Sequence, residues 1–497
     1  MSKRFRPIRL QIAAAAVILQ FFTISSAQTA EVTITVTRGE ASGITVHGRL
    51  QNLNNVGKEQ VISFPTRFEG IALPEDRVSG IRLTGPDGSN VNYRKLIPGE
   101  YLAEDDFNEF AYQVSLPIPN DNRAPAHVSW IGNTNGLLML SDLLPLIGGR
   151  KFPLKLKVNL PEGWEVNSSE KLVAENTFEV EDFHKAVFLI GTGLRKYGKA
   201  QLGKGNDFEM AFSGEWLFSD TEAAGMVSEI AGHYKKILGL VAGPFRVNIL
   251  KFPGNAGPGN WEAETRGSTV TIVSSDMPFR SQSLQRIHEQ LRHELFHLWI
   301  PNGLRLQGKY DWFYEGFTLY MSLKAGVMTN QIRFADFLDT LSRAKNIASR
   351  STQGISLIAE SKNQLSGSET HLYARGMAAA FLADVRLMAA SGGKKSIENV
   401  YRRLFETYRL PGPETDGSEA VLEIMRTNAE LIPVIEKYIS GADQLEWRQD
   451  LIAAGIEETG ENGRSLLRET TKPAGLQKTI LNKLGYNNWR KLSPVKK

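Results

Sequence analysis

The feature that most constrains this chain of 497 residues is the pattern His-Glu-x-x-His, formed by His293, Glu294 and His297. The surrounding residues 281–300 have the apolar spacing of a helix. A spacing of four residues is about 400° of rotation, so the two histidines lie on one face and can offer two imidazoles to one metal ion. Glu294 projects about 100° round the helix, within reach of a water molecule held by that ion.

A catalytic zinc site usually has a third protein ligand and keeps one position open. The chain contains no cysteine, so a metal must be held by His, Glu or Asp. Glu315 follows His297 after 17 intervening residues. A proline and a glycine end the first helix, and a second helix predicted over Trp312–Ala325 can fold back and present Glu315. We therefore expect His293, His297 and Glu315 to hold one Zn²⁺.

The N-terminal residues 1–27 have the order of a signal peptide. Basic residues precede an apolar run from Leu10 to Phe22, and small residues follow, with cleavage expected before Gln28. The run is shorter than the roughly 20 residues that span a bilayer, which favours a cleaved signal peptide. An uncleaved anchor helix is the alternative interpretation. No later segment is long and apolar enough to span a membrane, so we expect a periplasmic or secreted protein with no transmembrane segment in its mature part.

The rest of the chain is expected to form an α+β multidomain protein. Residues 28–195 contain short alternating runs, such as Val32, Ile34 and Val36, which predict an antiparallel β-sandwich-like domain. Residues 196–328 mix strands and helices and carry the metal motif, residues 329–456 predict a helical subdomain, and residues 457–497 a basic tail. The 58 basic and 54 acidic residues leave no large basic field, so no nucleic-acid partner is expected.

The two metal-site segments resemble a known family. His-Glu-Leu-Phe-His-Leu-Trp, followed by Trp-Phe-Tyr-Glu-Gly-Phe-Thr-Leu-Tyr, is similar to the gluzincin zinc metallopeptidases, and more to the glycyl aminopeptidase-like group than to the large alanyl aminopeptidases. The resemblance covers about residues 31–456. It implies a thermolysin-like catalytic domain at 196–328 behind an N-terminal β domain, one Zn²⁺, and Glu294 as general base. The PDZ domain that often ends such proteins is not expected here.

The resemblance also implies a tyrosine that stabilises the reaction intermediate. Tyr373, in Tyr-Ala-Arg-Gly, matches the Tyr-x-Lys-Gly motif of the superfamily, with Arg375 in place of lysine. That replacement preserves charge but not shape. His371 is the alternative donor to the oxyanion.

A further implied residue is an acid that holds the free amine of a substrate. The Gly-rich stretch 257–269 resembles the family segment Gly-Leu-Glu-His-x-x-Ser-Thr and places Glu264 at the acidic position. Thr265 stands where the family has histidine, which puts strict aminopeptidase specificity in question. Glu262 is the competing acid, and a flexible surface loop is the alternative interpretation of the stretch.

These expectations combine into one functional hypothesis. The chain is predicted to be an exported zinc peptidase acting on peptide or protein substrates, as an aminopeptidase if Glu264 binds the α-amine. The alternatives are a zinc endopeptidase, a hydrolase of non-peptide bonds, and an envelope protein that binds peptide without turnover.

Overall fold

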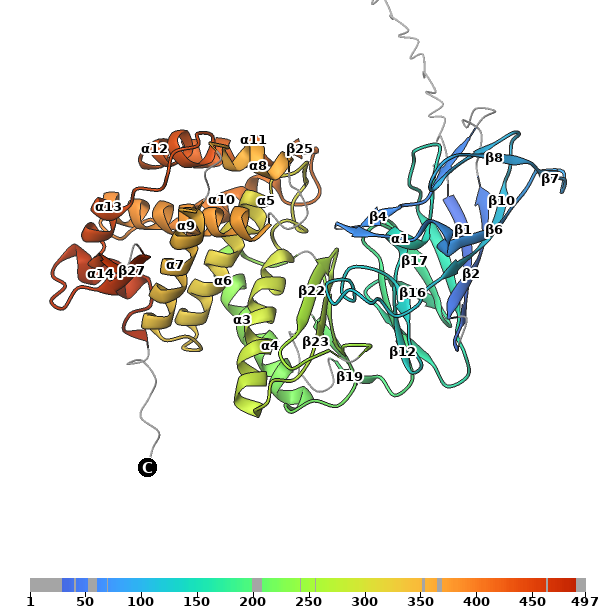
Figure 1. Cartoon of the computed structure of the whole chain (residues 1–497), viewed down its shortest axis with the longest axis horizontal. Coiled ribbons are helices and arrows are strands. Elements are labelled where there is room, and N and C mark those ends of the chain that lie inside the picture. Colours follow the sequence, from blue (N-terminus) through green and yellow to red (C-terminus); the bar gives the residue numbers. More distant parts are fainter. Residues whose placement is uncertain are drawn as a thin grey trace, which may run out of the picture.

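The computed structural model describes residues 29–39, 42–51, 60–68, 70–198, 208–241, 243–254, 256–350, 354–363, 369–461 and 464–488. Figure 1 shows a β-rich N-terminal part, a central part in which helices cover a sheet, and a largely helical C-terminal part, arranged side by side. The predicted signal peptide, residues 1–27, lies outside the described residues. Within them, every helix is too short or too polar to cross a bilayer.

The N-terminal part is built on an eight-stranded sheet in the order β16-β17-β14-β1-β2-β10-β6-β7. Alternate side chains of β1 (Thr29–Thr37) are buried, among them Val32, Ile34 and Val36. This burial is the physical basis of the alternation in the sequence. The predicted β-sandwich-like domain is confirmed, with one exception to its antiparallel pairing, because β1 runs parallel to β14 (Leu154–Asn159).

The remaining N-terminal elements complete this sheet and three smaller ones. They are β2 (Gly43–Gln51), β3 (Val61–Ser63), β4 (Arg67–Phe68), β5 (Ile71–Ala72), η1 (Glu75–Arg77), β6 (Val78–Thr84), β7 (Asn90–Val91), β8 (Tyr93–Ile97), β9 (Glu100–Ala103), β10 (Glu109–Ser115), β11 (Trp130–Ile131), β12 (Asn135–Met139), α1 (Leu140–Leu143), β13 (Leu146–Ile147), β15 (Glu165–Ser168), β16 (Lys171–Ala174), β17 (Thr177–Val180) and β18 (Val187–Gly191).

The central part is a five-stranded sheet in the order β19-β20-β21-β23-β22 with two long helices. Three strands are parallel, and β22 pairs antiparallel with β23 at the edge. The elements are β19 (Arg195–Tyr197), β20 (Phe208–Ser213), α3 (Asp220–Leu238), β21 (Phe245–Lys251), β22 (Trp261–Arg266), β23 (Thr269–Ser274) and α4 (Arg280–His297). The alternative of a flexible loop over 257–269 is therefore wrong for residues 261–266, which form the edge strand.

The two faces of this sheet have different partners. On β23, Val270 and Ile272 pack into the core that also contains the apolar residues of α3 and α4. Val273 points to the other face and packs with Trp130 and Leu137 of the N-terminal part. Residue parity along a strand of this sheet therefore decides whether a side chain meets the helices or the N-terminal part.

The C-terminal part packs helices around the long helix α9. Its elements are β24 (Leu306–Gln307), α5 (Asp311–Tyr314), α6 (Gly316–Met328), α7 (Phe334–Ala348), α8 (Leu357–Lys362), α9 (Glu369–Ala390), α10 (Ile397–Tyr408), β25 (Thr415–Asp416), α11 (Gly417–Arg426), η2 (Ala429–Leu431), α12 (Ile432–Val434), η3 (Ile435–Ile439), α13 (Arg448–Ala453), β26 (Ile456–Glu461), β27 (Arg464–Glu469) and α14 (Leu476–Lys483). One continuous apolar core joins it to α3, α4 and the central sheet.

The segment after residue 456 differs from the predicted basic tail. The strands β26 and β27 form a hairpin, and Leu467, Ile480 and Leu481 enter the main core. The segment is too short and polar to indicate a folded unit by itself. It folds because neighbouring helices supply the apolar surface that its few buried side chains need.

Candidate metal centre and active site

The two motif histidines lie one turn apart on α4, as their spacing predicts. Their Nε2 atoms are 3.1 Å apart, and their rings meet edge to face with centroids separated by 4.7 Å. His297 is almost fully buried, whereas His293 is partly exposed. The pair therefore presents two nitrogen atoms to one point at the edge of the core.

Glu315 lies at a break between two helices. The sequence predicts one helix over Trp312–Ala325, but the structure has α5 and α6, with Glu315 between them at φ −98° and ψ −57°. Its Oε2 is 3.1 Å from His293 Nε2 and its Oε1 is 3.5 Å from His297 Nε2. The break directs the carboxylate at the two imidazoles.

The largely buried carboxylate of Glu315 requires a positive charge beside it. Burial would raise the pKa of Glu315, but the imidazoles of His297 and His293 outweigh burial and hold it well below its usual range. Burial lowers the pKa of His297, yet Glu315 raises it to about 9. A buried carboxylate is stable only beside a positive charge, which either a protonated imidazole or a metal ion supplies.

The donor atoms fit zinc. His297 Nδ1 donates to the carbonyl of Ile300 at 3.0 Å, so in the neutral ring, the form that binds a metal, Nε2 carries the lone pair. Ligand atoms about 2.0–2.1 Å from a tetrahedral zinc ion lie about 3.3 Å from one another. The three distances among His293, His297 and Glu315 are 3.1, 3.1 and 3.5 Å. Two nitrogens and one carboxylate with an open fourth position match a catalytic zinc site.

Two glycines fix where Glu315 sits relative to α9. A Cβ atom on Gly316 would lie 2.7 Å from the Cα atom of Gly376, and one on Gly376 would lie 2.5 Å from the carbonyl oxygen of Trp312. Backbones cross here with no room for a side chain. Tyr373 lies one turn before Gly376, so this crossing brings it toward the segment that carries Glu315.

Tyr373 is half-buried and packs against the main core. The pKa of Tyr314 is raised by burial, by Asp311 and Glu315 and, to a smaller extent, by Tyr373. The Tyr314 ring in turn lies 6.4 Å from the His297 ring, centroid to centroid. Tyr373 is thus within electrostatic reach of the residues around the candidate metal site.

His371 and Arg375 face another side of α9. His371 Nδ1 lies 2.8 Å from Glu360 Oε1, and Arg375 pairs with the other oxygen of the same carboxylate. Residues four apart share a helix face, whereas Tyr373 is about 200° round the helix from His371. Arg375, which occupies the lysine position of the family motif, therefore forms an ion pair with Glu360 of α8.

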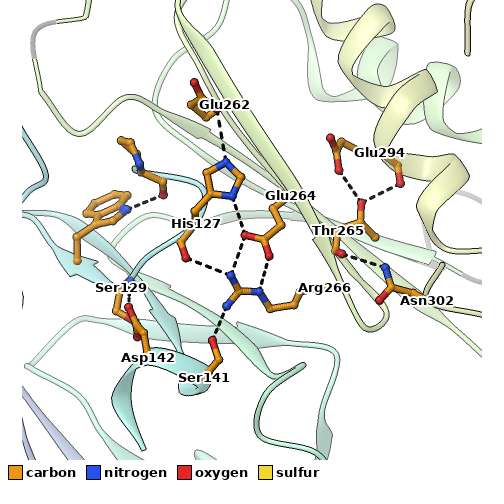
Figure 2. Close-up of polar contacts among 12 residues, drawn as sticks. His127, Ser129, Ser141, Asp142, Glu262, Glu264, Thr265, Arg266, Glu294 and Asn302 are labelled. Atoms are coloured by element: carbon orange, nitrogen blue, oxygen red, sulfur yellow. Dashed lines mark hydrogen bonds and ion pairs between the residues drawn. The ribbon is translucent and has the colours of Figure 1, made fainter. Parts of the chain in front are cut away.

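Glu294 is buried on α4 and is oriented by the edge strand. The hydroxyl of Thr265 lies 2.8 Å from Glu294 Oε2 and 2.8 Å from the Glu294 carbonyl oxygen (Figure 2). Asn302 Nδ2 donates to the Thr265 carbonyl at 3.0 Å. A threonine at this position therefore holds the predicted general base, a contact that the sequence does not indicate.

Glu264 projects from the opposite face of β22, toward the N-terminal part (Figure 2). Arg266 binds it through two nitrogens, at 2.6 and 2.8 Å, and His127 Nδ1 lies 2.9 Å from Glu264 Oε2. Glu262 Oε2 is 3.5 Å from His127 Nε2. Burial opposes ionisation, but Arg266 and His127 hold the pKa of Glu264 down to about 2.

Sequence reasoning missed His127. It lies in the segment between β10 and β11, far from the metal motif in the chain, and no local pattern marks it. Only the packing of the N-terminal part against β22 brings it to Glu262 and Glu264. His288, also on α4, is buried with Nδ1 facing Arg292, and burial and Arg292 lower its pKa to about 3.

The β domain, the five-stranded sheet with its motif helix and the helical part together form a fold shared with solved zinc metallopeptidases, the fold that the sequence resemblance implies. Among solved structures, it is similar to an aminopeptidase N family protein from Idiomarina loihiensis, with a TM-score of 0.73 and 15% identity over 87% of this chain and 79% of that chain. It is also similar to an M1 zinc metallopeptidase from Deinococcus radiodurans, with a TM-score of 0.53 and 14% identity over 84% of this chain and 94% of that one.

A third structure, yeast LTA4 hydrolase in complex with bestatin, has a TM-score of 0.50 and 14% identity over 85% of this chain and 67% of that chain. A mutant of the Deinococcus radiodurans enzyme is bound to a Tyr-Ser-Ala substrate. Sequence comparison finds no matching family model and no matching curated protein. The similarity of this protein to these structures is therefore a similarity of fold.

Proposed function

We propose that this protein is an exported zinc-dependent peptidase of the aminopeptidase type. The observation that carries the proposal is the convergence of His293, His297 and Glu315, with ligand atoms all within 4.8 Å of one another, beside the buried carboxylate of Glu294. The proposed export rests on the signal-peptide pattern of residues 1–27.

Each proposed catalytic residue has a separate role. A bound zinc ion polarises a carbonyl and lowers the pKa of a water molecule toward about 7. Glu294 would take the proton of the attacking water and pass it to the leaving nitrogen. Tyr373 would donate its hydroxyl proton in a hydrogen bond to the oxyanion that develops from the carbonyl. Thr265 would keep the Glu294 carboxylate oriented during both transfers.

The edge strand favours an extended peptide as substrate. The carbonyl of Asn260 accepts from Ser275, beside β23, whereas the Thr265 carbonyl accepts from Asn302 on the opposite edge. Odd-numbered residues of β22, including Ala263, therefore direct their N–H and C=O groups away from β23. No strand among the described residues pairs with that edge. A peptide could add there as a further strand, next to Glu294.

The acids of β22 bear on whether the enzyme removes N-terminal residues. Glu264 and Glu262 supply the only carboxylates of that strand and would pair with a protonated α-amine. Arg266 and His127 already pair with these carboxylates. A carboxylate whose charge is already paired gives little preference for a free amine, so an endopeptidase is the second candidate function.

The proposal is tested by zinc content and substrate choice together. The purified chain is expected to bind one zinc ion and to cleave glycyl and alanyl amides faster than their N-acetylated forms, with loss of activity on chelation. Cleavage of blocked peptides alone would favour the endopeptidase, and zinc binding with no hydrolysis of either substrate would contradict the proposed function.

Replacing Tyr373 by phenylalanine removes the proposed donor to the oxyanion while leaving the ring in place. We expect kcat to fall about 10²- to 10³-fold, the usual effect of losing one oxyanion donor, with unchanged zinc content. Steady-state kinetics and metal analysis measure both quantities. Tyr408→Phe is the matched control, since that hydroxyl bonds to the exposed Glu423 at 2.7 Å, and equal losses in both variants would contradict the assigned role.

A further inference from the structure

The N-terminal part contributes one side chain to the acids of the edge strand. His127 Nδ1 lies 2.9 Å from Glu264 Oε2 and its Nε2 lies 3.5 Å from Glu262 Oε2. Burial lowers the pKa of His127, but hydrogen bonds and charge from Glu262 and Glu264 raise it to about 10. At neutral pH the ring is therefore a cation that donates a hydrogen bond to Glu264 and lies within ion-pair distance of Glu262.

Arg266 holds this arrangement in place. It binds both oxygens of Glu264, donates to the backbone carbonyl of His127 at 3.1 Å and to Ser141 Oγ at 2.6 Å. Its guanidinium also lies over the Phe68 ring, 4.2 Å from the centroid. The ring of His127 is thus held both by the bond to its backbone carbonyl and by the contacts of its own nitrogens. Figure 2 shows the charged cluster of His127, Glu262, Glu264 and Arg266.

The cluster contains as many positive as negative charges. Glu262 and Glu264 supply two negative charges, and Arg266 and protonated His127 supply two positive charges. A substrate ammonium needs carboxylate oxygens as acceptors, and His127 already uses one oxygen of each acid. An ammonium ion that approaches Glu264 would also meet two neighbouring cations.

We propose that His127 is a specificity-determining residue that competes with the α-ammonium of the substrate for Glu262 and Glu264. The inference rests on the proposed peptidase function. It adds a physical reason why the enzyme would discriminate weakly between peptides with a free and with a blocked N-terminus. With His127 in place, peptides with a blocked N-terminus remain substrates. Without its charge, the same two acids select for a free amine.

The test compares substrate selectivity in His127→Asn and in the unmodified enzyme. The asparagine amide can replace the Nδ1 donor to Glu264 but carries no charge and does not reach Glu262. We expect the ratio of kcat/KM for alanyl-alanyl-alanine amide to that for its N-acetylated form to rise at least about tenfold, about the effect of one hydrogen bond to a charged group. Glu262→Gln combined with His127→Asn should reverse the gain.

The controls separate specificity from folding. His47, exposed on β2, provides the matched variant His47→Asn, and thermal unfolding establishes that each variant is folded. His127→Gln is the second variant if His127→Asn does not fold. An unchanged or lower selectivity ratio in a folded His127 variant would overturn the inference. So would an unmodified enzyme that prefers the free amine by more than about 10³-fold.

Failure of the proposed function would give a different result. If the unmodified zinc-loaded enzyme cleaves neither peptide, the peptidase proposal fails. The inference is then tested by calorimetric Kd values of the same two peptides for the Glu294→Gln protein with and without His127→Asn. A tenfold or greater gain for the free-amine peptide alone supports it, and equal changes for both peptides overturn it.

Discussion

Glu294→Gln is expected to retain one zinc ion per chain and to lose about 10²- to 10⁴-fold in kcat, the range for removal of a general base. The glutamine amide keeps an oxygen that can accept from the Thr265 hydroxyl, so the local packing of α4 against β22 is preserved. It cannot take a proton from water. Metal analysis and steady-state kinetics on the same preparation measure the two effects separately.

The matched control is Glu289→Gln on the same helix. Glu289 is exposed and pairs with Arg286 at 3.0 Å, on the turn before the metal motif. This variant should keep both zinc and turnover. Near-normal turnover in Glu294→Gln would rule out the proposed mechanism, and loss of zinc in that variant would mean that Glu294 supports the metal site instead.

His293→Ala should have the second large effect, on metal binding. The substitution removes one of three converging ligand atoms, and we expect zinc affinity to fall by more than about 100-fold, the upper range for loss of residues that only support a ligand. Glu315 would also lose a partner 3.1 Å away. Activity should disappear at zinc concentrations that saturate the unmodified enzyme.

Thermal unfolding provides a readout that does not depend on activity. A metal at 100 times its Kd stabilises the folded state by about 2.7 kcal/mol, so chelation should lower the Tm of the unmodified protein. The Tm of His293→Ala should respond little to chelator, whereas His47→Ala should respond as the unmodified protein does. An equal response in His293→Ala would show that the metal binds elsewhere.

The local part of the metal site was predictable because it depends on short-range geometry. A four-residue spacing on a helix brings His293 and His297 together in any fold that keeps the helix. The prediction of Glu315 as the third ligand required only a turn and a second helix after the motif. The helix break at Glu315, by contrast, lies next to the close approach of Gly316 to Gly376, and these two residues are 376 − 316 = 60 positions apart in the chain.

The edge strand was harder to predict. Residues 261–266 alternate Trp, Ala and Thr with charged residues, but the alternation is short and only Trp261 is a large apolar residue, so it is a weak strand signal. Pairing with the buried strand β23 supplies the backbone partners that make this segment a strand. Once the strand exists, residue parity sends Thr265 toward Glu294 and Glu264 toward the N-terminal part.

The sequence by itself therefore predicted the three residues that converge in the candidate metal centre, the proposed general base beside them, and the order of β-rich, mixed and helical parts. Each of these depends on periodicity or spacing over a few turns. The tertiary structure decided which residues surround that centre: Thr265 on the proposed base, Tyr373 within electrostatic reach of Tyr314, and His127 on the acids of β22. The contacts of Thr265 and His127 join segments distant in the chain, and the packing of the central sheet between α4 and the N-terminal part brings these two side chains within hydrogen-bond distance of their partners.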